Sequence, residues 1–365
     1  MRLALIGCGW IVERSHVPAL RDAQGVEVVA VADTSIERAR IVAKALGLPE
    51  RVCTTDHREL LARADVDAVS IATPPSSHRP LVEQAAAAGK HVICEKPLAT
   101  TLADADAMID ACAAAGVQLA LFHNYLWYPE TQEALRLIRD GEIGEVVATE
   151  VSGFGTRPWV GAEQGAPGWR HRLGASGGGA LMDAGVHALY LTEAYHGAPA
   201  ERIGATIRRG DDGVDTWAFC QLHFPGGGFG MVNVAWGEGD GRLSIMGTEG
   251  HITFLFDEGN GYYGMPARGL KIGRVGGDAR IWHRPLSWYR LFAPEIFSDF
   301  AAAVDGGDPS RYAAHGAEGR RAIELALAAY RAGVEGVPTP LPLSPVDPVY
   351  EGGFAALPAS APATA

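Results

Sequence analysis

The sequence has little cysteine and no motif that would bind a metal through cysteine or histidine. Its 365 residues include five cysteines, which occur singly, without a CxxC pair or a Cys/His cluster with zinc spacing. We therefore expect reduced thiols, no disulfide framework and no metal site, as in a cytoplasmic protein. The five are Cys8, Cys53, Cys94, Cys112 and Cys220.

Long apolar runs and an excess of positive charge are also missing. No stretch of eighteen apolar residues occurs, so we expect no membrane span. Residues 2–6 already have the pattern of a strand, so we expect no signal peptide. The net charge of −12 argues against nucleic-acid or anionic-membrane partners, because both need basic surfaces. With 47% apolar and 20% charged residues, the chain is typical of a globular protein with about two domains.

The first 122 residues alternate between short apolar runs and helical patterns. Helical patterns such as residues 101–115 separate the apolar runs. This alternation predicts βαβ units, and hence a doubly wound α/β domain with a parallel sheet covered by helices on both faces. The predicted strands are residues 2–6, 26–32, 68–72, 91–94 and 117–122.

After residue 122 the strands follow one another without helices between them. Glycine-rich turns separate them, which predicts an α+β domain with a large, open, mostly antiparallel sheet over residues 123–345. Alternating apolar residues such as Val232, Val234 and Trp236 suggest an uncovered sheet face, so we expect a homodimer or homotetramer. The chain from Pro338 onward is rich in proline and alanine, and residues 346–365 are predicted to form a C-terminal tail. The first part of this stretch could pack as an extended arm, and we expect residues 355–365 to be poorly ordered.

A glycine motif after the first strand indicates a dinucleotide site. Gly7-x-Gly9-x-x-Val12 opens a helix, as in pyrophosphate-binding loops, although Val12 stands where glycine or alanine is usual. Asp33 ends the second strand, where a carboxylate accepts hydrogen bonds from a ribose and repels a 2′-phosphate. Arg38 could reach back from the next helix, but a solvated helix face is its ordinary role. We predict NAD in preference to NADP, bound by Gly7, Gly9, Trp10, Ile11 and Asp33.

Three residues have the chemistry needed to take a proton from an alcohol. Asp183 and His187 follow a triple glycine at i, i+4 spacing, so on a helix they share one face. The carboxylate could orient the imidazole, or could simply stabilise the helix. Lys96 follows a strand at the carboxyl edge of the sheet, where doubly wound folds bind ligands, although most lysines are surface residues. We predict His187 as general base and Lys96 as hydrogen-bond donor to the same oxygen.

Aromatic and arginine residues occur together between residues 125 and 170. Aromatic rings stack on sugar rings, and guanidinium groups bind hydroxyls or carboxylates; core packing is an equally ordinary use of each ring. The predicted substrate-binding residues are Lys96, Tyr125, Trp127, Arg157, Trp169, Arg170, Asp183 and His187.

Three further motifs follow the glycine loop in order. They are Thr73-Pro74-Pro75-Ser76-Ser77-His78, Glu95-Lys96-Pro97 and Gly177-Gly178-Gly179-Ala180-Leu181-Met182-Asp183-x-Gly185-x-His187. With them, the chain resembles the glucose-fructose oxidoreductase/inositol dehydrogenase (Gfo/Idh/MocA) family over roughly residues 2–345. The resemblance implies a Rossmann domain and an open-sheet domain, NAD or NADP, a sugar, cyclitol or related polyol substrate, and dimers or tetramers. It also implies catalytic roles for Lys96, Asp183 and His187, a cis Lys96-Pro97 bond, and a cofactor lining that includes Thr73, Pro74, His78, Glu95 and Lys96.

Two departures from the family pattern concern the substrate. Leu126 stands where an arginine is expected, and Tyr190 stands where an acid is common three residues after the histidine. We expect an NAD(P)-dependent oxidoreductase acting on CH–OH groups. Two alternatives are an NAD-dependent glycoside hydrolase working by transient oxidation and a non-catalytic NAD-binding regulator. Retention of Lys96, Asp183 and His187 argues against the regulator.

Overall fold

The chain folds into two compact units. The computed structural model describes residues 1–155, 168–237, 241–256, 267–284 and 293–358. One unit comprises residues 1–127 and 290–320, and the other comprises residues 128–289 and 321–365.

These units differ from the predicted domains, residues 1–122, 123–345 and 346–365, in two places. Helix α9 (Pro294–Gly306) groups with the first unit, because Phe297 packs edge-on against His16 at a ring separation of 5.6 Å. The C-terminal segment is not a loose tail throughout. It forms helix α11 (Pro348–Gly352), and Phe354 beyond it is only 1% exposed.

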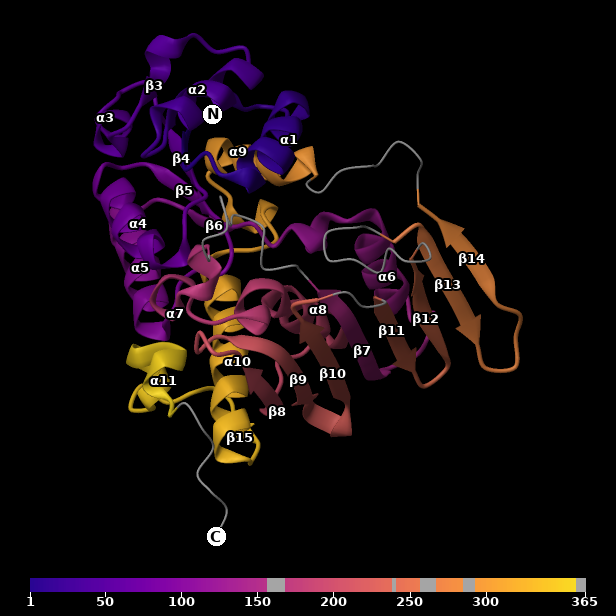
Figure 1. Ribbon diagram of the computed structural model, residues 1–365. Coiled ribbons are helices and arrows are strands. Elements are labelled where there is room, and N and C mark those ends of the chain that lie inside the picture. Colours follow the sequence, from indigo (N-terminus) through magenta and orange to yellow (C-terminus); the bar gives the residue numbers. More distant parts are fainter. Residues whose placement is uncertain (156–167, 238–240, 257–266, 285–292, 359–365) are drawn as a thin grey trace. The chain divides into compact units, whose positions relative to one another are not determined.

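The first unit contains a parallel sheet of six strands in the order β3-β2-β1-β4-β5-β6 (Figure 1). Its central strands, β1 and β4, are mostly apolar and have no exposed side chain, as expected when helices cover both faces. The order reverses between β1 and β4, the point at which doubly wound folds bind ligands. This arrangement confirms the predicted Rossmann sheet. Its strands are β1 (Arg2–Ile6), β2 (Glu27–Ala32), β3 (Cys53–Thr54), β4 (Ala68–Ile71), β5 (His91–Cys94) and β6 (Leu119–Leu121).

Helices α2, α3 and α5 of this unit begin at side chains that accept hydrogen bonds from backbone N–H groups of the first turn. Ser35 accepts from the N–H of Arg38, and Thr101 accepts from the N–H of Asp104 at 3.0 Å. Gly116 ends the helix that Thr101 begins, with a φ of +68°. The helices here are α1 (Val17–Asp22), α2 (Ile36–Ala45), α3 (His57–Leu61), α4 (His78–Ala87), α5 (Leu102–Ala115) and α9.

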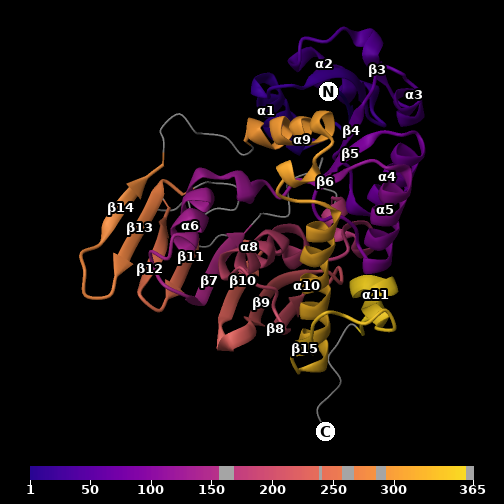
Figure 2. The same cartoon turned by 180° about the vertical axis from the view of Figure 1, so that it is seen from behind.

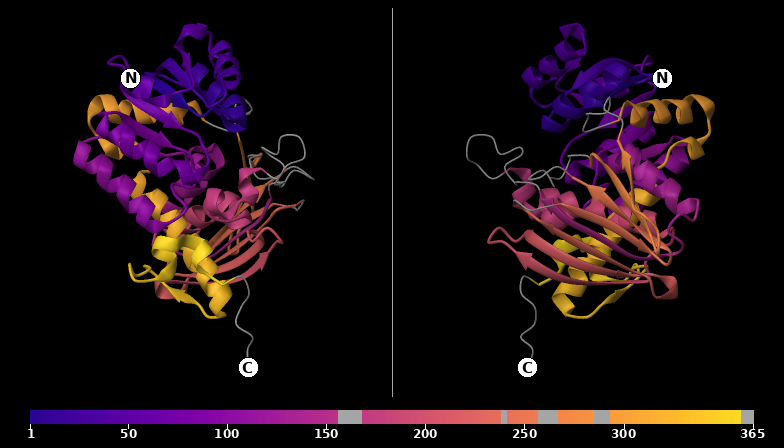
Figure 3. Two further views of the ribbon diagram at one scale, coloured as in Figure 1. Left: turned by 60° about the vertical axis from the view of Figure 1, so that its left-hand side comes forward. Right: turned by 90° about the vertical axis from the view of Figure 1, so that its right-hand side faces the viewer.

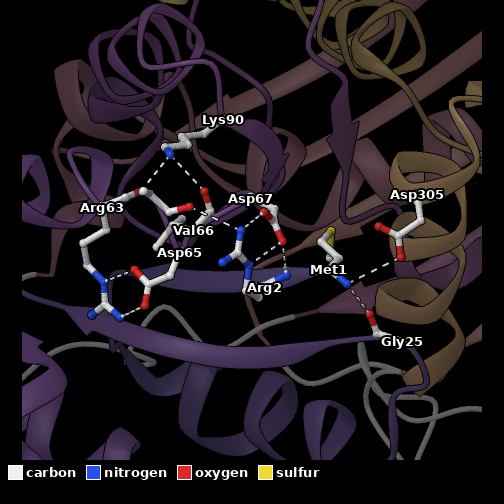
Figure 4. Close-up of polar contacts among 10 residues, drawn as sticks. Met1, Arg2, Gly25, Arg63, Asp65, Val66, Asp67, Lys90 and Asp305 are labelled. Atoms are coloured by element: carbon white, nitrogen blue, oxygen red, sulfur yellow. Dashed lines mark hydrogen bonds and ion pairs between the residues drawn. The ribbon is translucent and has the colours of Figure 1, made fainter.

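Charged residues hold the amino-terminal edge of this sheet together (Figure 4). The guanidinium of Arg2 donates two hydrogen bonds to Asp67, at 3.1 and 2.6 Å, and lowers the pKa of that carboxyl to about 2. The Lys90 ammonium donates to the carbonyls of Arg63 and Val66. These contacts join the start of β1 to the loop before β4, at the edge opposite the glycine motif.

The second unit contains a nine-stranded sheet, which Figure 2 shows in the order β14-β13-β12-β11-β7-β10-β9-β8-β15. All neighbouring strands are antiparallel except β7 and β10, so the predicted, mostly antiparallel sheet is confirmed. The strands are β7 (Val146–Gly155), β8 (Arg202–Arg209), β9 (Asp215–His223), β10 (Phe229–Ala235), β11 (Arg242–Gly247), β12 (Gly250–Leu255), β13 (Gly269–Arg274), β14 (Arg280–His283) and β15 (Thr339–Pro340).

Helix α8 (Val186–His196) covers one face of this curved sheet, whose side views appear in Figure 3. Val232 and Val234 are fully buried, so the expectation that they form an uncovered face was wrong. Side chains alternate along a strand, and the sequence pattern alone does not say which set faces the helix. The outward face instead carries Trp217 and Phe219, which are 47% and 42% exposed.

The remaining helices of the chain are α6 (Pro129–Arg139), α7 (Leu173–Ser176) and α10 (Gly316–Glu335). None of the helices in the described parts of the chain is both long and apolar enough to cross a membrane.

Candidate active site

The glycine loop has the shape that a dinucleotide needs. Gly7 has a φ of +94°, and a Cβ there would collide with the carbonyl of Ala72, so only glycine lets β1 turn beside β4. At Gly9 a Cβ would meet nothing within 4 Å, which leaves open space over the backbone for a pyrophosphate. The loop then enters the π-helical turn η1 (Val12–His16), where Val12 is buried. Trp10, on the loop, is 45% exposed, and Ile11 is half-buried.

Asp33 holds this loop in place. One carboxylate oxygen accepts from the backbone N–H of Cys8 at 2.7 Å, and the other accepts from the N–H of Ser35 at 2.8 Å. Burial, and then the charge of Asp33, raises the pKa of the Cys8 thiol, which therefore stays protonated. The carboxylate thus lies at the carboxyl end of β2 and is fixed by two backbone donors.

Glu95 connects the glycine loop to Lys96. Its Oε1 lies 2.9 Å from Nε2 of the buried His16 in η1, and its Oε2 accepts from the backbone N–H of Lys96 at 3.0 Å. The Lys96-Pro97 peptide is cis, as the resemblance implied. Lys96 is half-buried; burial and the Lys96 charge lower the pKa of His123 to about 3, so that ring is neutral.

His78 joins the loops that follow β4 and β5. Its Nε2 lies 2.9 Å from the carbonyl of Thr73, and its Nδ1 lies 3.0 Å from that of Leu98. Burial lowers its pKa. Ser77 donates a further hydrogen bond to the Thr73 hydroxyl, just before Pro74 turns the chain. The His78 ring is fully enclosed, and its contacts hold these loops. Its place in the cofactor lining stays a prediction.

In the second unit, Asp183 and His187 lie on a helix that begins with a π-helical turn, η6 (Leu181–Gly185), and continues as α8. Such turns are rare and often occur at functional sites. The Asp183 carboxylate accepts from Nε of Arg170 at 3.0 Å. The Arg170 guanidinium in turn lies 4.2 Å from the ring centre of Trp169. The structure therefore brings several predicted residues together here.

The imidazole of His187 has a partner that the sequence did not identify. Its Nδ1 lies 2.9 Å from the hydroxyl oxygen of Tyr190. The orienting role assigned to Asp183 stays a prediction. The sequence signal for Tyr190 was its position one helical turn after His187, which was noted only as a departure from the family pattern.

Two predicted aromatic residues lie in the first unit, in the short turn η4 (Asn124–Trp127). Trp127 donates its indole N–H to Asp299 at 2.8 Å and packs against Tyr312, so it contributes to the packing of this unit. Tyr125 is 7% exposed. Arg157 lies outside the described residues.

Comparison with known proteins identifies the family. Residues 1–123 match the family model described as an oxidoreductase family with an NAD-binding Rossmann fold, and residues 131–253 match the GFO/IDH/MocA C-terminal domain. The chain belongs to the GFO/IDH/MocA oxidoreductase family. It is 30% identical to a 1,5-anhydro-D-fructose reductase from Ensifer adhaerens over 342 residues, which cover 92% of this chain and 97% of that protein.

Other members of the GFO/IDH/MocA family match over different lengths. A D-apiose dehydrogenase from Paraburkholderia graminis is 48% identical, but over only 39% of this chain and 37% of that protein. The solved structure of an aldose-aldose oxidoreductase from Caulobacter crescentus, complexed with glycerol, superimposes with a TM-score of 0.82. That match has 26% identity over 93% of this chain and 99% of the other. Family membership confirms the predicted enzyme class, an oxidoreductase acting on CH–OH groups.

Proposed function

We propose that this GFO/IDH/MocA enzyme is an NAD-dependent dehydrogenase of a sugar, cyclitol or related polyol. The observation that carries the proposal is the helix bearing His187, which has its Nδ1 held by Tyr190, and Asp183, which is paired with Arg170. The family relatives named above act on small sugars, which supports the same class of substrate here.

The residues of the glycine loop fit a dinucleotide. We propose that the open space at Gly9 receives the pyrophosphate and that Asp33 binds the adenosine ribose. The rest of the dinucleotide would be lined by the loops that His78 and Glu95 hold, together with Trp10, Ile11, Thr73 and Pro74. When bound, the nicotinamide supplies the acceptor for the hydrogen and electron pair that leave the substrate carbon. Relatives include an NADP-dependent D-xylose 1-dehydrogenase from Haloarcula marismortui, so the preference for NAD rests on Asp33.

Side chains of the protein accept the proton that leaves the substrate hydroxyl. We assign the Nδ1 proton of His187 to a hydrogen bond with the Tyr190 hydroxyl, so that Nε2 carries no proton. Nε2 then acts as the base that accepts the proton of the substrate hydroxyl. Lys96 donates a hydrogen bond to the same oxygen and stabilises its developing charge. We assign the binding of neighbouring hydroxyls to Arg170 and stacking on the sugar ring to Trp169.

A screen of polyols, aldoses and sugar acids with NAD tests the proposal by the near-ultraviolet absorbance of NADH. At least one compound should give NADH with the wild-type enzyme and about a hundredfold less rate with His187→Ala. Cleavage of a glycoside without NADH accumulation would instead support hydrolysis by transient oxidation. NAD binding with neither reaction would support a regulator.

We also propose that the enzyme is a homodimer or homotetramer joined through the outward face of its nine-stranded sheet. Trp217, Phe219 and Phe229 are large apolar residues 37–47% exposed on β9 and β10. Light scattering should give about two or four times 38.5 kDa; the monomer mass would reject the proposal. Phe219→Lys should yield monomers. As a matched control, Val275→Lys at an exposed apolar site near β13 should leave the mass unchanged.

A further inference from the structure

The helix that carries Asp183 and His187 starts without a capping side chain of its own. Ala180 precedes the turn η6, and its methyl group cannot accept a hydrogen bond. The first N–H groups of a helix lack partners within the helix and must be satisfied by other groups. Here Asp215, on β9, accepts from the N–H of Gly179 at 2.6 Å and from the N–H of Leu181 at 2.8 Å. Asp215 thus caps this helix from a strand 34 residues beyond Leu181.

Asp215 is itself held by Tyr330. Asp215 has no exposed surface, and the hydroxyl of Tyr330, on α10, donates to its Oδ1 at 2.5 Å. A Cβ at Gly178 would collide with the Tyr330 hydroxyl, and one at Gly179 would collide with the Asp215 backbone. Two glycines of the motif are therefore required by this close approach, which brings strand, helix and carboxylate together.

The C-terminal segment covers Tyr330 in turn. The Phe354 ring stacks on the Tyr330 ring at 3.7 Å, with an angle of 11° between their planes. The Arg209 guanidinium lies 3.9 Å from the Phe354 ring centre. Asp347 caps α11 and forms an ion pair with Arg331 on α10, so α11 lies beside α10 in both Figures 1 and 2. The segment that the sequence suggested was a tail thus packs on the support of the helix.

We propose that Asp215 is a positioning residue for proton transfer by His187, and that Tyr330 and Phe354 keep it in place. The inference rests on the proposed function, since it concerns the same base. Neither Asp215 nor Tyr330 is exposed, so each acts through the backbone of residues 179–181, immediately before Asp183. A displacement of a reacting group by about 1 Å can reduce a rate by about a hundredfold.

Two variants test the proposal with little change in volume. Tyr330→Phe removes one hydroxyl and keeps the stack on Phe354. Asp215→Asn keeps the shape but replaces one acceptor oxygen with a donor. We expect kcat to fall about tenfold and about a hundredfold respectively, with the KM for the polyol and the Kd for NAD within about twofold of wild type. The double variant should lower kcat no further than Asp215→Asn alone, because both substitutions disturb the same hydrogen-bonded contact to the helix.

Tyr195→Phe is the matched control. Tyr195 is a fully buried tyrosine on the same helix, near its C-terminal end, and its variant should retain the wild-type kcat. If Asp215→Asn does not fold, Tyr330→Phe and its control still decide the question. A wild-type kcat in folded Tyr330→Phe and Asp215→Asn would overturn the proposal.

A second measurement needs no substrate. Amide hydrogen exchange of residues 177–189 should be faster in both variants and unchanged in Tyr195→Phe. Unchanged exchange in both variants, or faster exchange with an unchanged kcat, would reject a positioning role. If the wild type oxidises no polyol, the proposed function fails separately. In that case a shifted NMR titration of His187 in the variants still supports positioning, and an unchanged titration overturns it.

Discussion

Nδ1 of His187 lies 2.9 Å from the hydroxyl oxygen of Tyr190, one turn further along α8. A tyrosine hydroxyl both donates and accepts, so it can hold the imidazole in the tautomer in which Nε2 carries no proton. Being neutral, it does not stabilise the imidazolium as a carboxylate would. Orientation and charge support are therefore separable at this site.

We expect Tyr190→Phe to lower kcat about tenfold, because the ring loses its orienting hydrogen bond. Tyr190→Glu should retain more activity and shift the acidic limb of the pH–rate profile to higher pH. The sign follows from the carboxylate, which raises the pKa of His187, so the base form appears only at higher pH. Profiles of kcat/KM between pH 5 and 9 provide the measurement. Identical acidic limbs in the pH profiles of the wild type and Tyr190→Glu would contradict the role given to Tyr190.

The proposed catalytic residues should differ in their effects. Lys96→Ala and His187→Ala should each lower kcat about a hundredfold or more, since each removes direct help to the reacting oxygen. Asp183→Asn should cost less, because the amide can still accept the hydrogen bond of Arg170. Fluorescence titration should give nearly unchanged NAD affinity in all three. A rate independent of pH from 5 to 9, with chemistry rate-limiting, would exclude His187 as the base.

The sequence was a good guide to elements whose pattern is local. The Rossmann strands were predictable because a buried parallel strand is a nearly continuous apolar run, as in β6 (Leu119–Leu121). Positions set by tertiary contacts were not predictable. Met231 and Val232 are both apolar and point to opposite faces of β10. The sequence alone does not say which of the two faces is covered by the helix.

In the candidate site, too, features set by local sequence were predictable and features set by long-range contacts were not. Asp183 and His187 were recognisable from spacing within one helix. The bonds of Asp215 to Gly179 and Leu181 join residues more than 30 positions apart, so no local pattern indicates them. The stacking of Phe354 on Tyr330 was likewise hidden, because the composition of its segment favours at most an extended arm and does not say what it packs against.

The two glycines of the cofactor loop should behave differently. Gly9→Ala should fold normally, because its Cβ meets nothing within 4 Å, yet should weaken NAD binding about tenfold or more by occupying the pyrophosphate space. Gly7→Ala should lower the melting temperature as well, since its backbone has a positive φ and its Cβ would strike the Ala72 carbonyl. Thermal unfolding and NAD titration separate the two effects. Unchanged NAD affinity in Gly9→Ala would show that the pyrophosphate lies elsewhere.

Asp33 should decide between the two cofactors. The wild type should bind NAD more tightly than NADP, because the carboxylate repels a 2′-phosphate. Asp33→Ser should narrow the difference, and it should weaken NAD binding too, since the N–H groups of Cys8 and Ser35 lose their acceptor. Titration of both proteins with both cofactors checks this. Tighter binding of NADP by the wild type would refute the preference.

Glu130 should make the stability of the protein depend on pH. It is 2% exposed in the first turn of α6, and its Oε1 accepts from the N–H of Ala267 at 2.9 Å. Burial raises its pKa from 4.5 to about 7, against the opposing charge of Arg284. Between these two values the folded state holds a proton that the unfolded state has released. The free energy of unfolding therefore falls as pH rises through this window.

Glu130→Gln removes this titration and retains the acceptor oxygen. The attraction to Arg284 acts only on the ionised carboxylate and is already included in the pKa of about 7, so it adds no separate pH dependence. The free energy of unfolding of the variant, relative to wild type, should therefore rise by about 2 kcal/mol over that range. Urea unfolding at several pH values gives the difference. Glu133→Gln, in the same helix, is the control: Arg136 lowers the pKa of Glu133, so its contribution is constant above pH 5. A flat difference for Glu130→Gln would mean that Glu130 is already ionised in the folded protein at pH 5.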